Sequence, residues 1–116
     1  MQAIYHKKGH AVAWLSGKDI YNIRGHFIGY LIDNAVYNHN SDYCGTLKQS
    51  FFRDTQGYVV AFIKGAKGGP ALPSLKSLPS KSIKKLRPSI RVAPPPPVTK
   101  PSKHSWSKLE WEAFIQ

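Results

Sequence analysis

The side chains best suited to chemistry are four histidines and one cysteine in the first half of the chain. They are His6, His10, His26, His39 and Cys44. Four imidazoles in or beside the first turns of a repeat suit a zinc site, since histidine is a common ligand. A cysteine with a neighbouring base suits a thiol nucleophile. However, no His-x-x-x-His pair lies on an expected helix, and no second cysteine is present. We therefore expect no metal site, no cofactor and no catalytic residue.

Other constellations that carry chemistry are also missing from the sequence. The acidic residues Asp33 and Asp54 fall in expected turns and do not form a pair suited to general acid–base catalysis. No glycine-rich phosphate loop precedes an expected helix. The single cysteine excludes an internal disulfide. The question then becomes which elements would position the histidines and the cysteine.

Residues 4–66 repeat one sixteen-residue unit four times without a gap. The copies begin at Ile4, Ile20, Val36 and Phe52. Several columns of the alignment agree, and the clearest are an apolar first residue, a polar turn-former in third place, Gly or Ser in sixth place and a small residue in tenth place. The tenth column is Ala13, Gly29, Gly45 and Ala61. Such a register predicts an architecture built from repeats.

Each copy reads as strand, turn, strand, turn. The turn from Asn22 to Gly25 begins with an Asx residue and ends in glycine, which is typical of a type I turn closed by a left-handed residue. In the third copy Ser41 replaces this glycine, and we expect Asn40 to adopt the positive φ. Sixteen residues for two strands leave no room for a helix. The pattern therefore predicts an antiparallel meander whose four hairpins close into a ring.

Alternation along the second strand of each copy predicts which side chains face the centre. In the second copy these are Phe27, Gly29 and Leu31. The equivalent sets are Ala11, Ala13 and Leu15; Tyr43, Gly45 and Leu47; and Val59, Ala61 and Ile63. The opposite, apolar face would carry Trp14, Ile28, Tyr30, Val60 and Phe62. Cys44 aligns with Val12, Ile28 and Val60, so we interpret it as a small apolar filler.

The tandem unit Ile-Tyr-Asn-x-x-Gly-x-x-x-Gly-Tyr-Leu, together with the closing segment 61–66, resembles the bacterial four-fold β-flower family. The resemblance covers residues 4 to about 70. It implies four hairpins about a pseudo-four-fold axis and supplies no catalytic residue, because the family is uncharacterised. This chain departs from the pattern at Ser41, at Thr46 in place of an aromatic residue and at Arg53 in place of Tyr.

A change of composition divides the chain into three parts. Residues 1–66 form the repeat domain, with a net charge of +3, and the rest of the chain carries +8. All nine prolines lie after residue 69, so we predict that 67–104 is an extended or disordered basic linker. Within it Leu72, Leu75 and Leu78 recur every three residues. This spacing either arises by chance or places a leucine edge on the aromatic face of the repeat domain.

The linker also contains a run of basic side chains that could contact an anionic polymer. They are Lys76, Lys81, Lys84, Lys85, Arg87 and Arg91. Such a run can neutralise phosphates of a nucleic acid, with binding that weakens as salt rises. It lacks interleaved aromatic residues for base stacking. Binding to an anionic membrane surface or a simply solvated tail explains the same run equally well.

Residues 105–116 predict a short amphipathic helix. Ser107 and Glu110 fit a capping box, and we expect a helix over 108–115. Its apolar side chains should dock on the repeat domain or on a partner, because an isolated helix this short is marginal in water. These docking residues are Trp106, Leu109, Trp111, Phe114 and Ile115.

The sequence thus predicts an all-β fold of four tandem sixteen-residue hairpins, followed by a Pro-rich extended segment and a short C-terminal helix. No transmembrane segment and no signal peptide are expected, which favours a cytoplasmic protein. Our first hypothesis for function is a non-enzymatic interaction or structural module. The alternatives are non-specific binding of nucleic acid or an anionic membrane surface through 76–91, and an enzyme of unknown type. The partner and the oligomeric state remain open.

Overall fold

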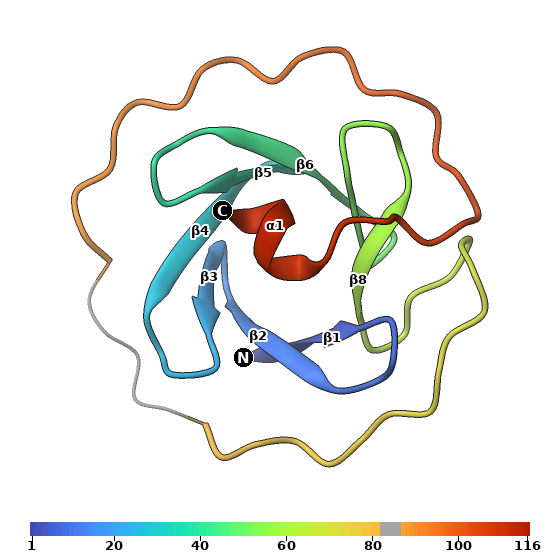
Figure 1. The fold of residues 1–116 in the computed structure, drawn as a ribbon. Coiled ribbons are helices and arrows are strands. Elements are labelled where there is room, and N and C mark those ends of the chain that lie inside the picture. The colour runs from blue at the N-terminus through green and yellow to red at the C-terminus, as the bar shows by residue number, and fades with distance from the viewer. Residues whose placement is uncertain (82–86) are drawn as a thin grey trace.

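The repeat domain is a closed barrel with a helix at its centre (Figure 1). The computed structural model describes residues 1–81 and 87–116, within which it has eight strands and one helix. These are β1 (Gln2–His6), β2 (Ala11–Ser16), β3 (Asp19–Asn22), β4 (Phe27–Ile32), β5 (Ala35–Asn38), β6 (Tyr43–Lys48), β7 (Phe51–Arg53), β8 (Val59–Ile63) and α1 (Trp111–Ile115). Each strand pairs antiparallel with the next, and β8 pairs with β1. The predicted all-β fold of four tandem hairpins is confirmed.

Consecutive strand pairs form four petals, and every petal contains the same irregularity. In petal 1 (β1–β2), Ile4 faces Ala13 but Tyr5 faces Ala11, so Val12 has no residue opposite it. The same shift recurs in petals 2 (β3–β4), 3 (β5–β6) and 4 (β7–β8). A β-bulge of this kind changes the direction of the following side chains.

The bulge corrects the predicted faces of the second strands. Ile28 and Val60, predicted to face outward, pack in the central cluster. Conversely, alternation placed the residue just before each bulge at the centre. The structure instead places these residues in the two other hydrophobic clusters, which lie outside the central one. These residues are Ala11, Phe27, Tyr43 and Val59. Simple alternation fails here because one extra residue reverses the phase between the two ends of the strand.

The turns within the petals follow the predicted Asx pattern. Asn22 Oδ1 accepts hydrogen bonds from the backbone N–H groups of Arg24 at 2.9 Å and His26 at 3.0 Å, and the turn ends at Gly25 with φ of 84°. Petals 3 and 4 repeat this geometry from their own Asx residues. The expectation for petal 3 is wrong in one detail, because Ser41 itself adopts the positive φ of 66°.

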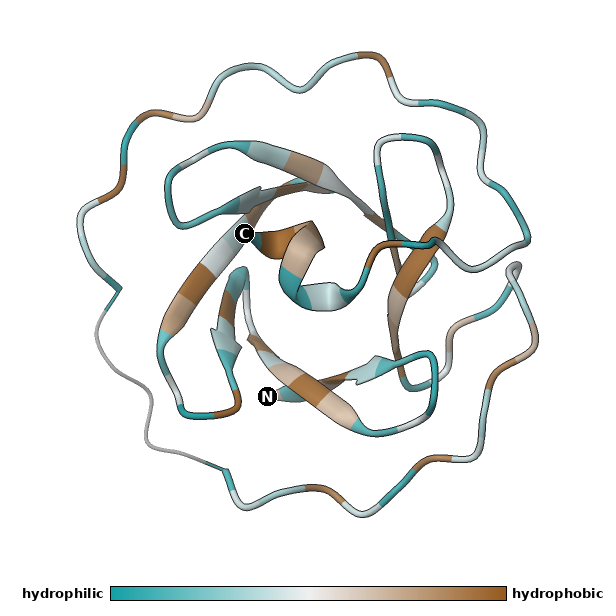
Figure 2. Ribbon diagram, in the orientation of Figure 1, coloured by the Kyte–Doolittle hydropathy of each residue, from teal (hydrophilic) through white to brown (hydrophobic). Residues whose placement is uncertain are grey.

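The centre of the barrel is filled by the first residue of each copy and by α1. Figure 2 shows α1, with its hydrophobic residues in brown, at this centre. The four first residues, Ile4, Ile20, Val36 and Phe52, are completely buried. The Trp111 ring lies edge-on to Phe52, with 5.3 Å between centroids. A Cβ atom on Gly45 would lie 2.9 Å from the Phe114 ring. The small tenth residue therefore makes room for the helix as well as for the neighbouring strand.

The helix is shorter than predicted. It begins at Trp111 after Glu110, which makes no side-chain capping bond, so the predicted capping box does not form. Ser107 Oγ instead accepts a hydrogen bond from the backbone N–H of Leu109 and donates one to Asp54. Trp111, Phe114 and Ile115 are buried, whereas Leu109 is 43% exposed and does not dock. Trp106 is half-buried and packs against the ring of Phe62 on β8.

Between the barrel and α1, the described parts of the chain run around the outside of the petals before the chain turns inward to the centre (Figure 1). We call the described residues 67–81 and 87–105 the belt; they are extended and contain neither helix nor strand. The Cα atoms of the protein extend 37 and 36 Å along the two longest axes. The described belt residues therefore lie around the outside of a nearly round barrel.

Candidate functional site

The belt is held at equivalent points of two petals. The backbone N–H of Lys76 donates to Gly9 O at 3.0 Å in petal 1, and that of Lys103 donates to Gly57 O at 3.0 Å in petal 4. A Cβ atom on either glycine would collide with a belt carbonyl oxygen, at Ser74 or Pro101 respectively. The sixth column therefore serves two purposes: it supplies the positive φ of the turn and it lets the belt approach.

Petal 3 holds the belt through side chains. Ser41 Oγ donates to Arg91 O at 2.7 Å, and Tyr37 Oη donates to Pro94 O at 2.7 Å. Pro94 has no N–H group and cannot donate as Lys76 and Lys103 do. The tyrosine hydroxyl thus supplies the donor on this petal.

These contacts explain a second repeat in the sequence, which lies outside the repeat domain. Pro70, Pro79, Pro88 and Pro97 stand nine residues apart. The two equivalent donors, Lys76 and Lys103, lie three such steps apart in the sequence. Lys76 donates to petal 1 and Lys103 donates to petal 4, which are three repeats apart. The belt therefore has its own four-fold repeat of nine residues, matched to the sixteen-residue repeat of the barrel.

Several basic residues of the belt contact the outer face of the barrel. Lys81 Nζ lies 5.9 Å from the Trp14 ring centroid. Arg87 Cζ lies 4.9 Å from that of Tyr30, and its Nη1 lies 3.3 Å from Asp19 Oδ1. Arg91 donates to Asn40 O from Nη2 at 2.8 Å. Cation–π contacts of this kind contribute about 0.5–1 kcal/mol when exposed.

The predicted basic run is thus not simply a free surface. Lys76 is exposed, and its backbone is bonded to petal 1. Lys84 and Lys85 lie outside the described residues. The structure brings Arg87 and Arg91 to petals 2 and 3 and places Lys81 against petal 1. The four described side chains of the run, those of Lys76, Lys81, Arg87 and Arg91, are therefore distributed over three petals.

The leucine edge is exposed and is not buried against the barrel. Leu72, Leu75 and Leu78 are 39%, 40% and 51% exposed. The residues that approach the barrel in this part of the belt are Pro70, Pro73 and Pro79, which are half-buried. An extended chain with three residues per turn presents one edge inward and leaves the others to solvent.

The histidines do not meet at one site. His6 and His10 stack, with 4.5 Å between ring centroids. His6 Nε2 contacts Glu110 Oε2 at 2.8 Å, while its Nδ1 accepts a bond from the backbone N–H of Lys8. His26 and His39 lie in the turns of other petals. In the described part of the chain, no group of three potential metal-binding side chains is present.

Cys44 is the bulge residue of petal 3 and packs against the central cluster. Burial raises the pKa of its thiol to about 12, the opposite of what a nucleophilic thiolate requires. Its Sγ contacts Asp42 O at 3.5 Å. The position suits a small apolar filler.

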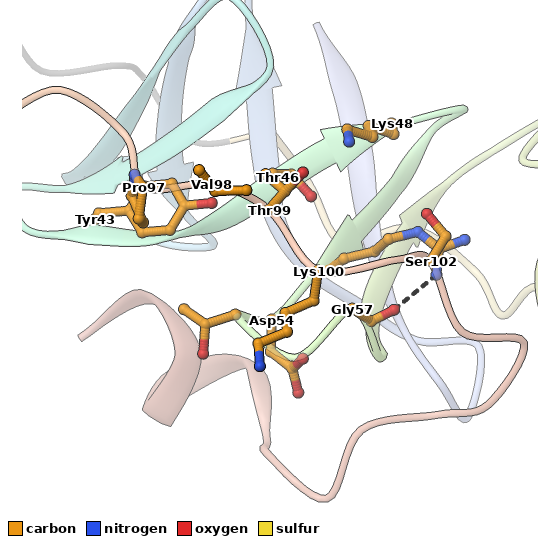
Figure 3. A pocket seen from close by; sticks show the side chains of 12 residues that line it. Tyr43, Thr46, Lys48, Asp54, Gly57, Pro97, Val98, Thr99, Lys100 and Ser102 are labelled. Atoms are coloured by element: carbon orange, nitrogen blue, oxygen red, sulfur yellow. Dashed lines mark hydrogen bonds between the residues drawn. The ribbon is translucent and has the colours of Figure 1, made fainter.

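The most unusual polar residue is Arg53 on β7, which occupies the column held by Tyr5, Tyr21 and Tyr37 in the other petals. It is 2% exposed, and burial lowers the pKa of its guanidinium. Its Nη1 donates to Gly57 O at 2.9 Å, the dashed bond in Figure 3, and to Lys103 O at 2.6 Å. In the sequence alone, this arginine is only a departure from the repeat.

Comparison with known protein families identifies the family of this chain. A family model described as 4-fold beta flower protein matches residues 2–115, which includes the belt and α1 as well as the barrel. No curated protein and no solved structure matches the chain. Among the described residues, no helix has the length and apolar character needed to cross a bilayer.

Proposed function

The chain belongs to the 4-fold beta flower protein family, and from this premise we propose that it is a non-enzymatic binding module whose contact surface is the outer edge of the belt. The family has no assigned enzymatic activity. The barrel and α1 act as the rigid support, and the belt presents side chains to a partner protein.

The side chains that could react already take part in structural contacts, and this supports a binding role over a catalytic one. The thiol of Cys44 is buried with a raised pKa. The Asp54 carboxylate accepts bonds from the backbone of Gln56 and Tyr58 and from the hydroxyl of Ser107. The His6 imidazole has a partner on each nitrogen. Each of these groups thus has a structural task in the turns or at the base of α1.

The observation that carries the proposal is the exposed leucine edge. Leu72, Leu75 and Leu78 stand on one side of an extended chain whose inward side is bonded to petal 1. The belt is already ordered by the barrel, so a partner need not supply the free energy of ordering it. An extended, proline-containing edge with an apolar side chain every third residue suits an aromatic-lined groove on another protein.

The experiment compares three forms of the full-length chain in quantitative affinity capture from the source cells. One is the native chain, one carries Leu72→Ser, Leu75→Ser and Leu78→Ser, and the control carries Val92→Ser and Val98→Ser. The control valines are 96% and 98% exposed on another part of the belt. We expect a partner that is retained by the native and control chains and lost from the leucine variant at unchanged Tm. Identical retention by all three chains would contradict the proposal.

Non-specific binding of nucleic acid is the second candidate, favoured by the net charge of +11. The engagement of Arg87 with Asp19 and of Arg91 with Asn40 argues against it, because these cations already have partners. A gel shift with duplex DNA from low to physiological salt decides between the two. Binding that weakens steeply with salt, and that disappears when Lys76, Lys84 and Lys85 are replaced by Gln, would favour nucleic acid.

A further inference from the structure

Beside petal 4 lies an open groove lined by apolar side chains that the fold leaves uncovered. It runs between the turn 54–58 and the segment 106–109 and has a volume of about 500 Å³. Tyr58 and Leu109 in its lining are 36% and 43% exposed, and Trp106 is half-buried. We call it the petal 4 groove. A groove lined by aromatic rings suits an extended peptide chain.

The two walls of the petal 4 groove are bonded to each other. Ser107 Oγ donates to Asp54 on one wall and accepts a bond from the backbone N–H of Leu109 on the other. The backbone N–H of Val59 donates to Ser105 O at 3.1 Å, and its carbonyl oxygen accepts from the N–H of Ser107 at 2.7 Å. The groove is thus formed before a ligand arrives, which lowers the entropy lost on binding.

The leucine edge lies next to this groove on the rim of the molecule. Arg53 Nη1 donates to Lys103 O at 2.6 Å, and its Nη2 donates to Gly68 O at 3.4 Å, so one guanidinium reaches both ends of the belt. Figure 1 shows the two ends of the belt on the same side of the molecule. The leucine edge begins at Leu72, four residues after Gly68, and continues onto petal 1, which adjoins petal 4 because β1 pairs with β8.

The edge and the groove are complementary in shape and in apolar character. Residues 70–81 are extended and combine three prolines with the three exposed leucines. A chain of this kind presents an apolar side chain every third residue, which fits between aromatic rings. The backbone of this segment is bonded to petal 1 through Lys76, so it cannot fill the groove of its own chain. The groove is left for a segment of another molecule.

The local charges are complementary as well. Residues 70–81 carry Lys76 and Lys81 and no acidic side chain. Three of the six acidic residues of the chain lie in the petal 4 groove or within three residues of its lining in the sequence, namely Asp54, Glu110 and Glu112. Glu110 and Glu112 are exposed, and Lys108 is the one cation in the lining. A basic segment therefore meets an acidic corner of an otherwise basic molecule.

We propose that the partner of the leucine edge is a second copy of this chain, whose petal 4 groove receives residues 70–81. The inference rests on the proposed function, since it names the protein that the belt binds. Contacts across a two-fold axis are reciprocal, so each copy gives its edge and receives the edge of the other. Because edge and groove lie on adjacent petals, both contacts form within one closed dimer.

Sedimentation of the full-length chain over a range of concentrations measures this association. Physiological salt is used, because it screens the repulsion between two chains of net charge +11 beyond about 8 Å. We expect a reversible equilibrium between monomer and dimer. A native chain that stays monomeric at every concentration overturns the proposal.

Two sets of substitutions at exposed side chains identify the contact, and unchanged Tm values show that both chains remain folded. The edge variant carries Leu72→Ser, Leu75→Ser and Leu78→Ser, and the groove variant carries Tyr58→Ser and Leu109→Ser. Each should weaken the dimer at least tenfold. The control with Val92→Ser and Val98→Ser, whose valines lie elsewhere on the belt, should associate as the native chain does. A dimer that is unchanged in either the edge or the groove variant overturns the proposal.

A mixture of the two variants tests whether edge and groove meet each other. The mixed pair retains one native contact, the edge of the groove variant in the groove of the edge variant. It should therefore form in preference to either variant with itself, as measured by sedimentation with one variant fluorescently labelled. Equal association of the mixed and the single variants overturns the proposal. If the native chain is monomeric and its leucine edge retains a protein of another sequence, this inference fails while the proposed function stands.

Discussion

His6 Nε2 on the first strand lies 2.8 Å from Glu110 Oε2, which immediately precedes the C-terminal helix. The two residues are 104 positions apart in the chain. This contact joins the start of the barrel to the base of α1, which follows the belt. The ends of the chain are thereby tied to the same petal.

We expect the stability of the protein to fall as pH is lowered from 7 to 4. Burial, and then the neighbouring His6 and Lys76, lower the pKa of His10 below its ordinary 6.5. The unfolded chain therefore takes up a proton first, and stability is lost as pH falls below about 6.5. The hydrogen bond from His6 lowers the pKa of Glu110, so a second loss begins below about 4.5.

Urea unfolding at a series of pH values measures this dependence. His10→Asn should flatten the upper part of the profile, because the group that takes up the first proton is gone. His26→Asn is the matched control, since His26 is an exposed turn residue of petal 2. A profile that is equally steep in both variants would assign the effect to other groups.

Gly57→Ala should destabilise the protein more than Gly65→Ala. Both glycines have nearly the same φ, 92° and 93°, so both substitutions introduce the same backbone strain of about 1–2 kcal/mol. Only Gly57 also faces the belt, where a Cβ atom would meet Pro101 O, while Gly65 has open space. The clash should add about 1–3 kcal/mol to the loss of unfolding free energy, measured by chemical denaturation. Equal losses of unfolding free energy in the two variants would mean that the belt can move away from Gly57 at no cost.

Phe114→Ala should cost about 3–5 kcal/mol of unfolding free energy, because Phe114 is buried in the central cluster beside Gly45. Leu109→Ala, on the exposed segment before α1, should change stability by less than about 0.5 kcal/mol. Deletion of 105–116 should in addition increase the fluorescence of a hydrophobic dye, since the barrel centre loses its cover. Dye binding that does not change would show that α1 contributes little to closing the barrel.

Cys44 should react slowly with a thiol reagent in the folded protein. Burial raises its pKa from 9.0 to about 12, so near neutral pH the thiolate fraction is about a thousandfold lower. Unfolding in urea should restore the rate of a free cysteine. The rate of disulfide exchange with an aromatic disulfide, followed by absorbance, measures both states. Rapid reaction of the folded chain would indicate that petal 3 opens.

Much of the barrel follows from the sequence alone. The third and sixth columns predict the turns because Asx side chains and positive-φ residues act within four residues of one another. The first column is apolar in every copy, and Ile4, Ile20, Val36 and Phe52 are all completely buried. The tenth column also predicts a close approach, which α1 and the neighbouring strand provide at Gly29 and Gly45.

Tertiary structure decides where the remaining residues act. The bulge at Val12 and its equivalents reverses a face that alternation alone assigns differently. The nine-residue spacing of Pro70 and its equivalents is present in the sequence, but it acquires meaning only from the contacts of the belt with the petals. Arg53 reads as an irregularity in the repeat until the belt covers it. Local periodicity reflects contacts within a petal. The belt and α1 are instead positioned by contacts between residues 50 to 104 positions apart, and these contacts depend on the shape of the folded barrel.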